Sequence, residues 1–135
     1  MDKVSALRKY FGLDGFRPGQ ERLIDDILCG RDCLGIMPTG GGKSLCYQLP
    51  ALLLPGLTLV VSPLISLMKD QVEALREDGI PAAYLNSSLD TQERREVLAG
   101  LGRGEFRLLY IAPERLDSRA FASLAQELEI SLVAV

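Results

Sequence analysis

The stretch Met37-Pro38-Thr39-Gly40-Gly41-Gly42-Lys43-Ser44 decides the fold of this chain. Its three consecutive glycines allow backbone N–H groups to turn toward a bound anion without interference from a Cβ atom. The side chain of Lys43 can then reach the outer phosphates of a nucleotide, and the hydroxyl of Ser44 can bind Mg²⁺. This stretch, the phosphate loop, therefore predicts a site for a nucleoside triphosphate and its metal ion.

The segments on either side of the phosphate loop fit this interpretation. An apolar run at residues 33–37 predicts a strand, and the pattern from about residue 43 to 53 predicts a helix. A loop between a strand and a helix is the context that phosphate binding requires, and the helix N-terminus adds partial positive charge. Met37 stands where the strict pattern has its first glycine. The alternative, a glycine-rich surface turn, is disfavoured by the strand–helix junction.

Short apolar runs alternate with helical patterns along the rest of the chain. We expect strands at residues 57–61, 82–85, 106–111 and 131–135, and helices at about 4–11, 23–28, 65–78, 90–101 and 119–128. This alternation predicts an α/β fold, a parallel β-sheet with helices on both faces. Ligands of such sheets bind outside the carboxyl ends of the strands, so the loops after the strands should meet at one edge.

The composition is that of an ordinary soluble domain. With 135 residues, 47% of them hydrophobic, the chain amounts to one domain or a piece of one and can bury a core. Its net charge of −3 argues against a surface devoted to nucleic acid, but allows a local groove that follows a phosphate backbone. No apolar run approaches the ~20 residues of a membrane span, and no secretory signal is visible. We expect a cytoplasmic or nucleoid-associated location and no membrane partner.

The cysteines predict no metal site. There are three, Cys29, Cys33 and Cys46, without paired CxxC spacing, and the chain has no histidine. Zinc sites need such ligands at characteristic spacings. We expect free, buried thiols in a reducing compartment.

A second cluster, Phe11-Gly12-Leu13-Asp14-Gly15-Phe16-Arg17-Pro18-Gly19-Gln20, precedes the phosphate loop. We call it the base-reading segment, because a glutamine amide can bond adenine N6 and N7 and an arginine can stack on the ring. The alternative is a structural connection between two helices, with Phe16 buried. The residues alone leave both interpretations open.

Polar residues follow three of the expected strands, in the loops Ser62-Pro63-Leu64, Asn86-Ser87-Ser88 and Ala112-Pro113-Glu114-Arg115. As isolated features they are typical helix caps and turns. Functionally, they are also residues that can grip the phosphate backbone of a single strand. The nearby cations Lys69, Arg94 and Arg95 are interpreted as solvated charges on helix faces.

Taken together, four segments resemble successive motifs of the RecQ family of superfamily 2 DNA helicases. They are Phe16-Arg17-Pro18-Gly19-Gln20, the phosphate loop continued through Leu45-Cys46-Tyr47-Gln48-Leu49-Pro50, Val60-Val61-Ser62-Pro63-Leu64-Ile65-Ser66-Leu67-Met68-Lys69-Asp70-Gln71, and Tyr110-Ile111-Ala112-Pro113-Glu114-Arg115-Leu116. The resemblance covers nearly the whole chain. It also accounts for Met37, since the phosphate loop of this family departs from the strict pattern in the same way.

The resemblance implies roles for individual residues. The residues that would contact adenine and the phosphates are Leu13, Arg17, Gln20, Thr39, Gly40, Gly41, Gly42, Lys43 and Ser44. Among them, Lys43 would be catalytic and Ser44 would bind Mg²⁺. The DNA-facing edge would hold Ser62, Pro63, Asn86, Ser87, Pro113 and Glu114. Leu13 departs from the family, whose members often place an aromatic residue there to stack on the base, so adenine packing should be built differently in this chain.

The resemblance also predicts what the chain does. Residues 1–30 would form N-terminal helices with the base-reading segment, and residues 31–135 part of a RecA-like ATP-binding domain. The full protein would be an ATP-dependent 3′–5′ DNA helicase of recombination and repair, with zinc only in a C-terminal region. The family's Asp-Glu-Ala-His motif should follow the last strand, so we expect this chain alone to hydrolyse little ATP. Another superfamily 2 translocase, such as an RNA helicase, and a non-catalytic nucleotide-binding module are the alternatives.

Overall fold

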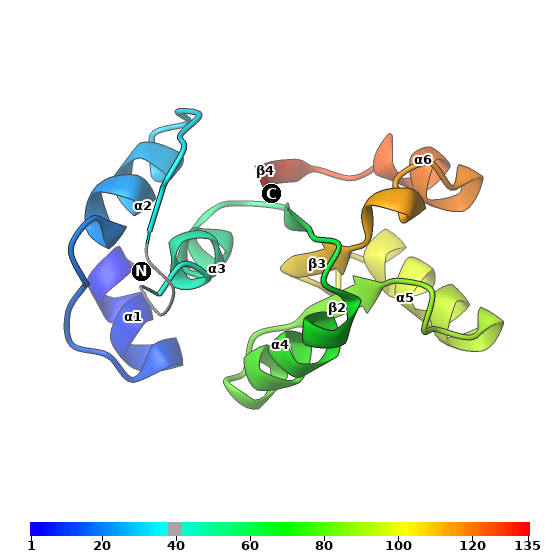
Figure 1. Cartoon of the computed structure of the whole chain (residues 1–135), viewed down its shortest axis with the longest axis horizontal. Helices are drawn as coiled ribbons and strands as arrows, with labels where there is room; N and C mark the ends of the chain where they lie inside the picture. Colours follow the sequence, from blue (N-terminus) through cyan, green and yellow to red (C-terminus); the bar gives the residue numbers. More distant parts are fainter. Residues whose placement is uncertain (38–41) are drawn as a thin grey trace. The chain divides into compact units, whose positions relative to one another are not determined.

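The computed structural model describes residues 1–37 and 42–135, which form two compact units, Met1–Pro55 and Gly56–Val135 (Figure 1). The division at Pro55 falls inside the predicted nucleotide-binding part, and a functional boundary near residue 30 stays a prediction.

The first unit consists of three short helices, α1 (Lys3–Phe11), α2 (Gln20–Leu28) and α3 (Leu45–Leu53). They pack around a small apolar cluster made of Ala6, Leu7, Ile24, Leu45 and Leu49. The ammonium group of Lys3 joins α1 to α2, since it lies 2.6 Å from Asp25 Oδ1 and 2.9 Å from Glu21 Oε2. All three helices were predicted, with ends shifted by a few residues.

The predicted strand at residues 33–37 is wrong. The segment has no regular secondary structure, and the side chains of Leu34 and Ile36 are 86% and 91% exposed. A β-rich run becomes a strand only when a neighbouring strand pairs with its backbone groups. The described residues of the first unit contain no other strand, so within this unit the run has no ladder to join.

The second unit is an α/β sheet. Its elements are β1 (Leu57–Val61), α4 (Ile65–Glu77), β2 (Ala82–Leu85), α5 (Thr91–Gly102), β3 (Leu108–Ile111), the 3₁₀ turn η1 (Pro113–Arg115), α6 (Arg119–Ala125) and β4 (Ile130–Ala134). The strands are all parallel and lie in the order β2-β3-β1-β4. The predicted fold class is therefore confirmed in this unit. The longest described helix, α4, has 13 residues, and among the described helices none is long and apolar enough to cross a membrane.

Helices cover both faces of this sheet. One face carries Leu57, Leu59, Leu85, Leu109 and Ile111, against which Leu101 of α5 and Phe121 of α6 pack. Because successive side chains of a strand point to opposite faces, the residues between them face the other way. On that second face α4 packs against β2 with Met68, Val72 and Leu75 buried.

The parallel arrangement brings three loops to one edge. In the register of the sheet, Val61 of β1 and Leu85 of β2 are both aligned with Ile111 of β3. The loops that leave these strands therefore start side by side, at what we call the carboxyl edge of the second unit. This confirms the sequence-based expectation for the three loops of that unit.

Candidate nucleotide site and nucleic-acid edge

Gln20 connects the base-reading segment to the phosphate loop. It is the first residue of α2, directly after Gly19 in the left-handed conformation, and its side chain is buried. Its Oε1 atom accepts a hydrogen bond of 2.8 Å from the backbone N–H of Arg17. Its Nε2 atom donates one of 3.0 Å to the carbonyl oxygen of Gly42. Two segments that lie 22 residues apart in the sequence therefore share one side chain.

Only glycine fits at position 42. Its φ is +77°, a conformation that residues with a Cβ atom rarely adopt. A Cβ atom there would also lie 2.3 Å from Gln20 Nε2, well inside van der Waals contact. The last glycine of the phosphate loop is thus required by its backbone conformation and by the close approach of Gln20.

Lys43 and Ser44 follow at the start of α3. The side chain of Lys43 is exposed, and Ser44 is the N-cap residue. The carbonyl oxygen of Ser44 accepts the 2.9 Å bond from Gln48 N, whereas its hydroxyl makes no capping bond. The hydroxyl of a serine at an N-cap commonly accepts a hydrogen bond from a backbone N–H, and among the described residues the hydroxyl of Ser44 makes no such bond. The predicted contacts Thr39, Gly40 and Gly41 lie outside the described residues.

The rest of the base-reading segment has features of both a structural connection and a binding surface. Phe16 packs partly buried against the apolar cluster of the first unit, as expected for a structural connection. Arg17 is exposed at the surface of the same loop. Leu13, in the place where a stacking aromatic was expected, is 46% exposed. Packing of Phe16 therefore does not compete with a surface contact by Arg17 or Leu13.

Two of the polar residues at the carboxyl edge order their own turns. The Oγ atom of Ser62 accepts a 3.1 Å bond from Leu64 N. Asn86 is 2% exposed; its Oδ1 atom accepts bonds from the N–H (2.8 Å) and the hydroxyl of Ser88, and its Nδ2 donates to Met68 Sδ. These side chains shape the loops, while the neighbouring Pro63 and Ser87 are exposed.

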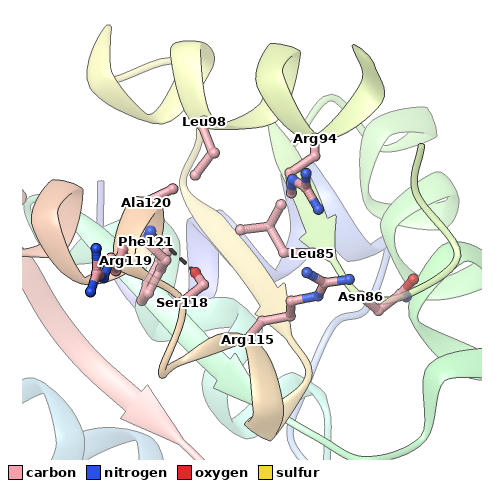
Figure 2. Close-up of a pocket in the computed structure, with 9 residues that line it drawn as sticks. All are labelled: Leu85, Asn86, Arg94, Leu98, Arg115, Ser118, Arg119, Ala120 and Phe121. Carbon is pink, nitrogen blue, oxygen red and sulfur yellow. Dashed lines mark hydrogen bonds between the residues drawn. The ribbon is translucent and has the colours of Figure 1, made fainter. Parts of the chain in front are cut away.

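The loop after β3 continues into the 3₁₀ turn η1. Pro113 and Glu114 are exposed at its start, and Arg115 at its end is half-buried. Arg115 lines a cavity of about 250 Å³ together with Arg94 of α5 (Figure 2). Arg115 belongs to the loop that the sequence predicts to grip a phosphate backbone, whereas Arg94 was predicted to be a solvated charge on a helix face. Arg94 is instead half-buried, whereas Arg95 and Lys69 are exposed as expected.

The thiols differ from the expectation of burial. All three cysteines are free, but only Cys46 is buried, while Cys29 and Cys33 are exposed at the end of α2 and beyond it. Burial raises the pKa of the Cys46 thiol. Slight desolvation and the carboxylates of Asp26 and Asp32 raise the pKa of the Cys33 thiol, although Cys33 is exposed. Both thiols are therefore protonated at neutral pH. In the described residues no group of three or more His, Cys, Asp or Glu side chains gathers around a possible metal position.

Comparison with known proteins assigns the chain to a family. The sequence profile of the DEAD/DEAH box helicases matches residues 17–134, from the base-reading segment to the end of β4. The chain belongs to this family. The match agrees with a phosphate loop and a parallel sheet, and the family's use of ATP fits the predicted triphosphate site.

Within this family the chain is similar to RecQ helicases, as its motifs predicted. It is 53% identical over 97% of its length to the ATP-dependent DNA helicase RecQ of Bacillus subtilis (strain 168), and 52% identical over 94% to that of Synechocystis sp.. It is 46% identical over 96% to the probable ATP-dependent DNA helicase RecS of Bacillus subtilis. The chain spans 22%, 27% and 26% of these three relatives, so it corresponds to a part of each.

Proposed function

We propose that this chain is the ATP-binding part of an ATP-dependent DNA helicase that moves 3′ to 5′ and acts in recombination and repair. The observation that carries the proposal is the bond from Gln20 to Gly42, because it joins a base-reading side chain to the phosphate loop. One nucleotide could then contact both segments at once. The similarity to relatives named as ATP-dependent DNA helicases supports the same conclusion.

Adenine would be recognised by Gln20, Arg17 and Leu13. A glutamine side chain has two N–H donors and two acceptor lone pairs, and the bonds to Arg17 and Gly42 use one of each. The remaining donor and acceptor match N7 and the N6 amino group of adenine. The ring would lie against the Arg17 guanidinium and the exposed face of Leu13, in place of an aromatic partner.

The phosphate loop would bind the phosphates and Mg²⁺. Thr39, Gly40, Gly41 and Gly42 would offer backbone N–H groups, and Lys43 would neutralise charge that develops on the outer phosphates. The hydroxyl of Ser44, which makes no capping bond in the described part of the chain, fits a Mg²⁺ ligand. Mg²⁺ is usually bound by few protein groups, with water and substrate phosphates completing its shell. When bound, the ion would neutralise phosphate charge.

Hydrolysis needs more than these groups. Phosphoryl transfer requires a positioned water as well as the metal, and the resemblance to the RecQ family implies that an Asp-Glu-Ala-His motif would hold both. The 135 residues contain neither that motif nor any histidine. We therefore expect the chain alone to bind ATP and to hydrolyse little of it.

A single DNA strand would cross the carboxyl edge, along Ser62, Pro63, Asn86, Ser87, Pro113 and Glu114. The side chains of Ser62 and Asn86 hold their turns, which supports a role in presenting backbone groups to phosphates. Contacts of this kind carry no sequence information. Binding should therefore be independent of base sequence, and a cytoplasmic, nucleoid-associated location is consistent with DNA as the partner.

Binding of fluorescent ATP, with GTP as competitor, tests the nucleotide assignment. Lys43→Ala should abolish binding, and Gln20→Ala should erase the preference for ATP. The matched controls Lys69→Ala and Gln126→Ala replace exposed residues of the second unit and should change neither. An unchanged base preference in Gln20→Ala would refute the role of Gln20.

Binding of single-stranded DNA and of RNA of equal length distinguishes a DNA helicase from an RNA helicase. A chain that binds RNA but does not bind DNA would refute the assignment to a DNA helicase.

A further inference from the structure

Two side chains approach the carbonyl oxygen of Gly42, the last glycine of the phosphate loop. The Nε2 atom of Gln20 donates its bond of 3.0 Å to this oxygen. The Sγ atom of Cys46, the second residue of α3, lies 3.9 Å from the same oxygen. All three residues belong to the first unit. The nucleotide assignment gives Gln20 a role at this point and leaves Cys46 without one.

The thiol of Cys46 is suited to donate to this carbonyl. Its side chain is 4% exposed, and burial raises the pKa of the thiol, so the proton stays on the sulfur at neutral pH. A protonated thiol is a weak hydrogen-bond donor, and its contacts are longer than those of a hydroxyl because sulfur is larger than oxygen. The contact runs from a side chain to the carbonyl four residues earlier, as serine and threonine hydroxyls do in helices.

The direction of the Gly42 carbonyl decides the direction of the N–H of Lys43. In a planar trans peptide, the C=O of one residue and the N–H of the next point in opposite directions, and the bond between Gly42 and Lys43 is trans. Because the oxygen faces Gln20 and Cys46, the N–H of Lys43 faces away from both. Within residues 1–37 and 42–135 this N–H has no acceptor. It also lies directly before the N-cap of α3, where a helix favours an anion.

Burial of Cys46 has a second explanation, which the test must separate from the first. A free cysteine behaves as a small apolar residue and is among the most buried residue types. Packing of this kind depends on the volume of the side chain. Donation to Gly42 depends instead on a proton that a side chain of any similar volume does not supply. Variants that change volume and donor separately therefore distinguish the two.

We propose that Cys46 is a positioning residue, whose S–H holds the Gly42 carbonyl together with Gln20 so that the N–H of Lys43 faces the phosphates of the nucleotide. The inference rests on the proposed function and adds a residue to the phosphate half of its site. The thiol acts through Gly42 and does not itself contact the nucleotide. Its loss should therefore affect ligands that carry a triphosphate and spare those that carry only base and ribose.

Calorimetric titration with two probes, inorganic triphosphate with Mg²⁺ and adenosine, tests the proposal. Cys46→Ala and Cys46→Val both remove the donor, the first with a smaller side chain and the second with a larger one. Each should weaken triphosphate binding about threefold, near the lower end for loss of a neutral hydrogen bond, and leave adenosine binding unchanged. Cys46→Ser keeps a donor and should bind triphosphate as the wild type does. The matched control Cys29→Val replaces an exposed thiol of the same unit and should change neither.

A second readout needs no ligand. In an NMR spectrum of the free protein, the amide resonance of Lys43 should move in Cys46→Ala and Cys46→Val, and much less in Cys46→Ser. Circular dichroism checks that each variant is folded.

The remaining outcomes show which claim fails. If Cys46→Ala and Cys46→Val bind triphosphate as tightly as the wild type, the inference is wrong and the proposed function survives. Loss in only one of these two variants, equal loss for both probes, or the same loss in Cys46→Ser would assign the effect to packing and refute the inference. If the wild type binds neither ATP nor triphosphate, the proposed nucleotide site is itself wrong, and the role of Cys46 fails with it.

Discussion

Replacing Gly42 with alanine perturbs the contact between the phosphate loop and the base-reading segment. A Cβ atom at this position meets Gln20 Nε2 at 2.3 Å, on a backbone with φ of +77°. The left-handed backbone costs alanine about 1–2 kcal/mol, and loss of the bond from Gln20 adds about 0.5–1.5 kcal/mol. We therefore expect Gly42→Ala to lower the free energy of unfolding by about 1.5–3.5 kcal/mol.

Gly30→Ala is the matched control for the backbone term. Gly30 belongs to the same unit and has φ of +80°, but an added Cβ atom there would meet nothing within 4 Å. It should cost only about 1–2 kcal/mol in urea unfolding followed by circular dichroism. A double-mutant cycle of Gly42→Ala with Gln20→Ala isolates the clash, because the second change removes the group that Cβ would strike.

We expect the double variant to be more stable than the sum of the single changes predicts, by roughly 0.5–1.5 kcal/mol. Equal costs for Gly42→Ala and Gly30→Ala, together with additivity in the cycle, would refute the contact on which the nucleotide assignment depends.

Two further predictions concern local stability. Hydrogen bonds to Asp25, the larger cause, and to Glu21 raise the pKa of the Lys3 ammonium above its usual 10.5. The ion pairs of Lys3 therefore stabilise the fold at neutral pH, and their contribution is lost as the pH rises through the raised pKa. Lys3→Met should accordingly be less stable than the wild type at pH 7 and equally stable in strong alkali, as measured by urea unfolding across pH; a difference that persists in alkali contradicts the ion pair. Asp90→Ala removes the capping box of α5, in which Asp90 Oδ1 accepts from Glu93 N at 2.7 Å, and should cost about 0.5–2 kcal/mol. Gln92→Ala, at an exposed site on the same helix, is its control, and equal thermal midpoints in the two variants would count against the cap.

Much of the second unit was predictable because the local sequence signals for strands and helices agree there with the tertiary fold. The run at β1 is apolar at successive positions, as a strand covered on both faces requires, and four of its five residues are buried. The capping box at Asp90 and Glu93 is legible in the sequence and is present in the structure. Element type and order follow from such signals without knowledge of tertiary contacts.

The features that the sequence did not predict share one cause, because each depends on residues that are distant in the sequence. Residues 33–37 have the composition of a strand, but a strand exists only through its neighbour. The bond from Gln20 to Gly42 spans 22 positions, and no local pattern encodes it. Arg94 looks like any charge on a helix face until the fold brings Arg115 beside it.

The side-chain amide of Gln20 offers the most direct test of the central claim, that one residue joins base recognition to the phosphate loop. Its NH₂ resonances can be assigned in an NMR spectrum by their loss in Gln20→Ala. They should shift when Mg²⁺-ATP is added, and stay in place when inorganic triphosphate or Mg²⁺-GTP is added at equal concentration. Resonances that ignore ATP while the amides of Lys43 and Ser44 respond would show that the phosphate loop binds a nucleotide without Gln20, and would contradict the account.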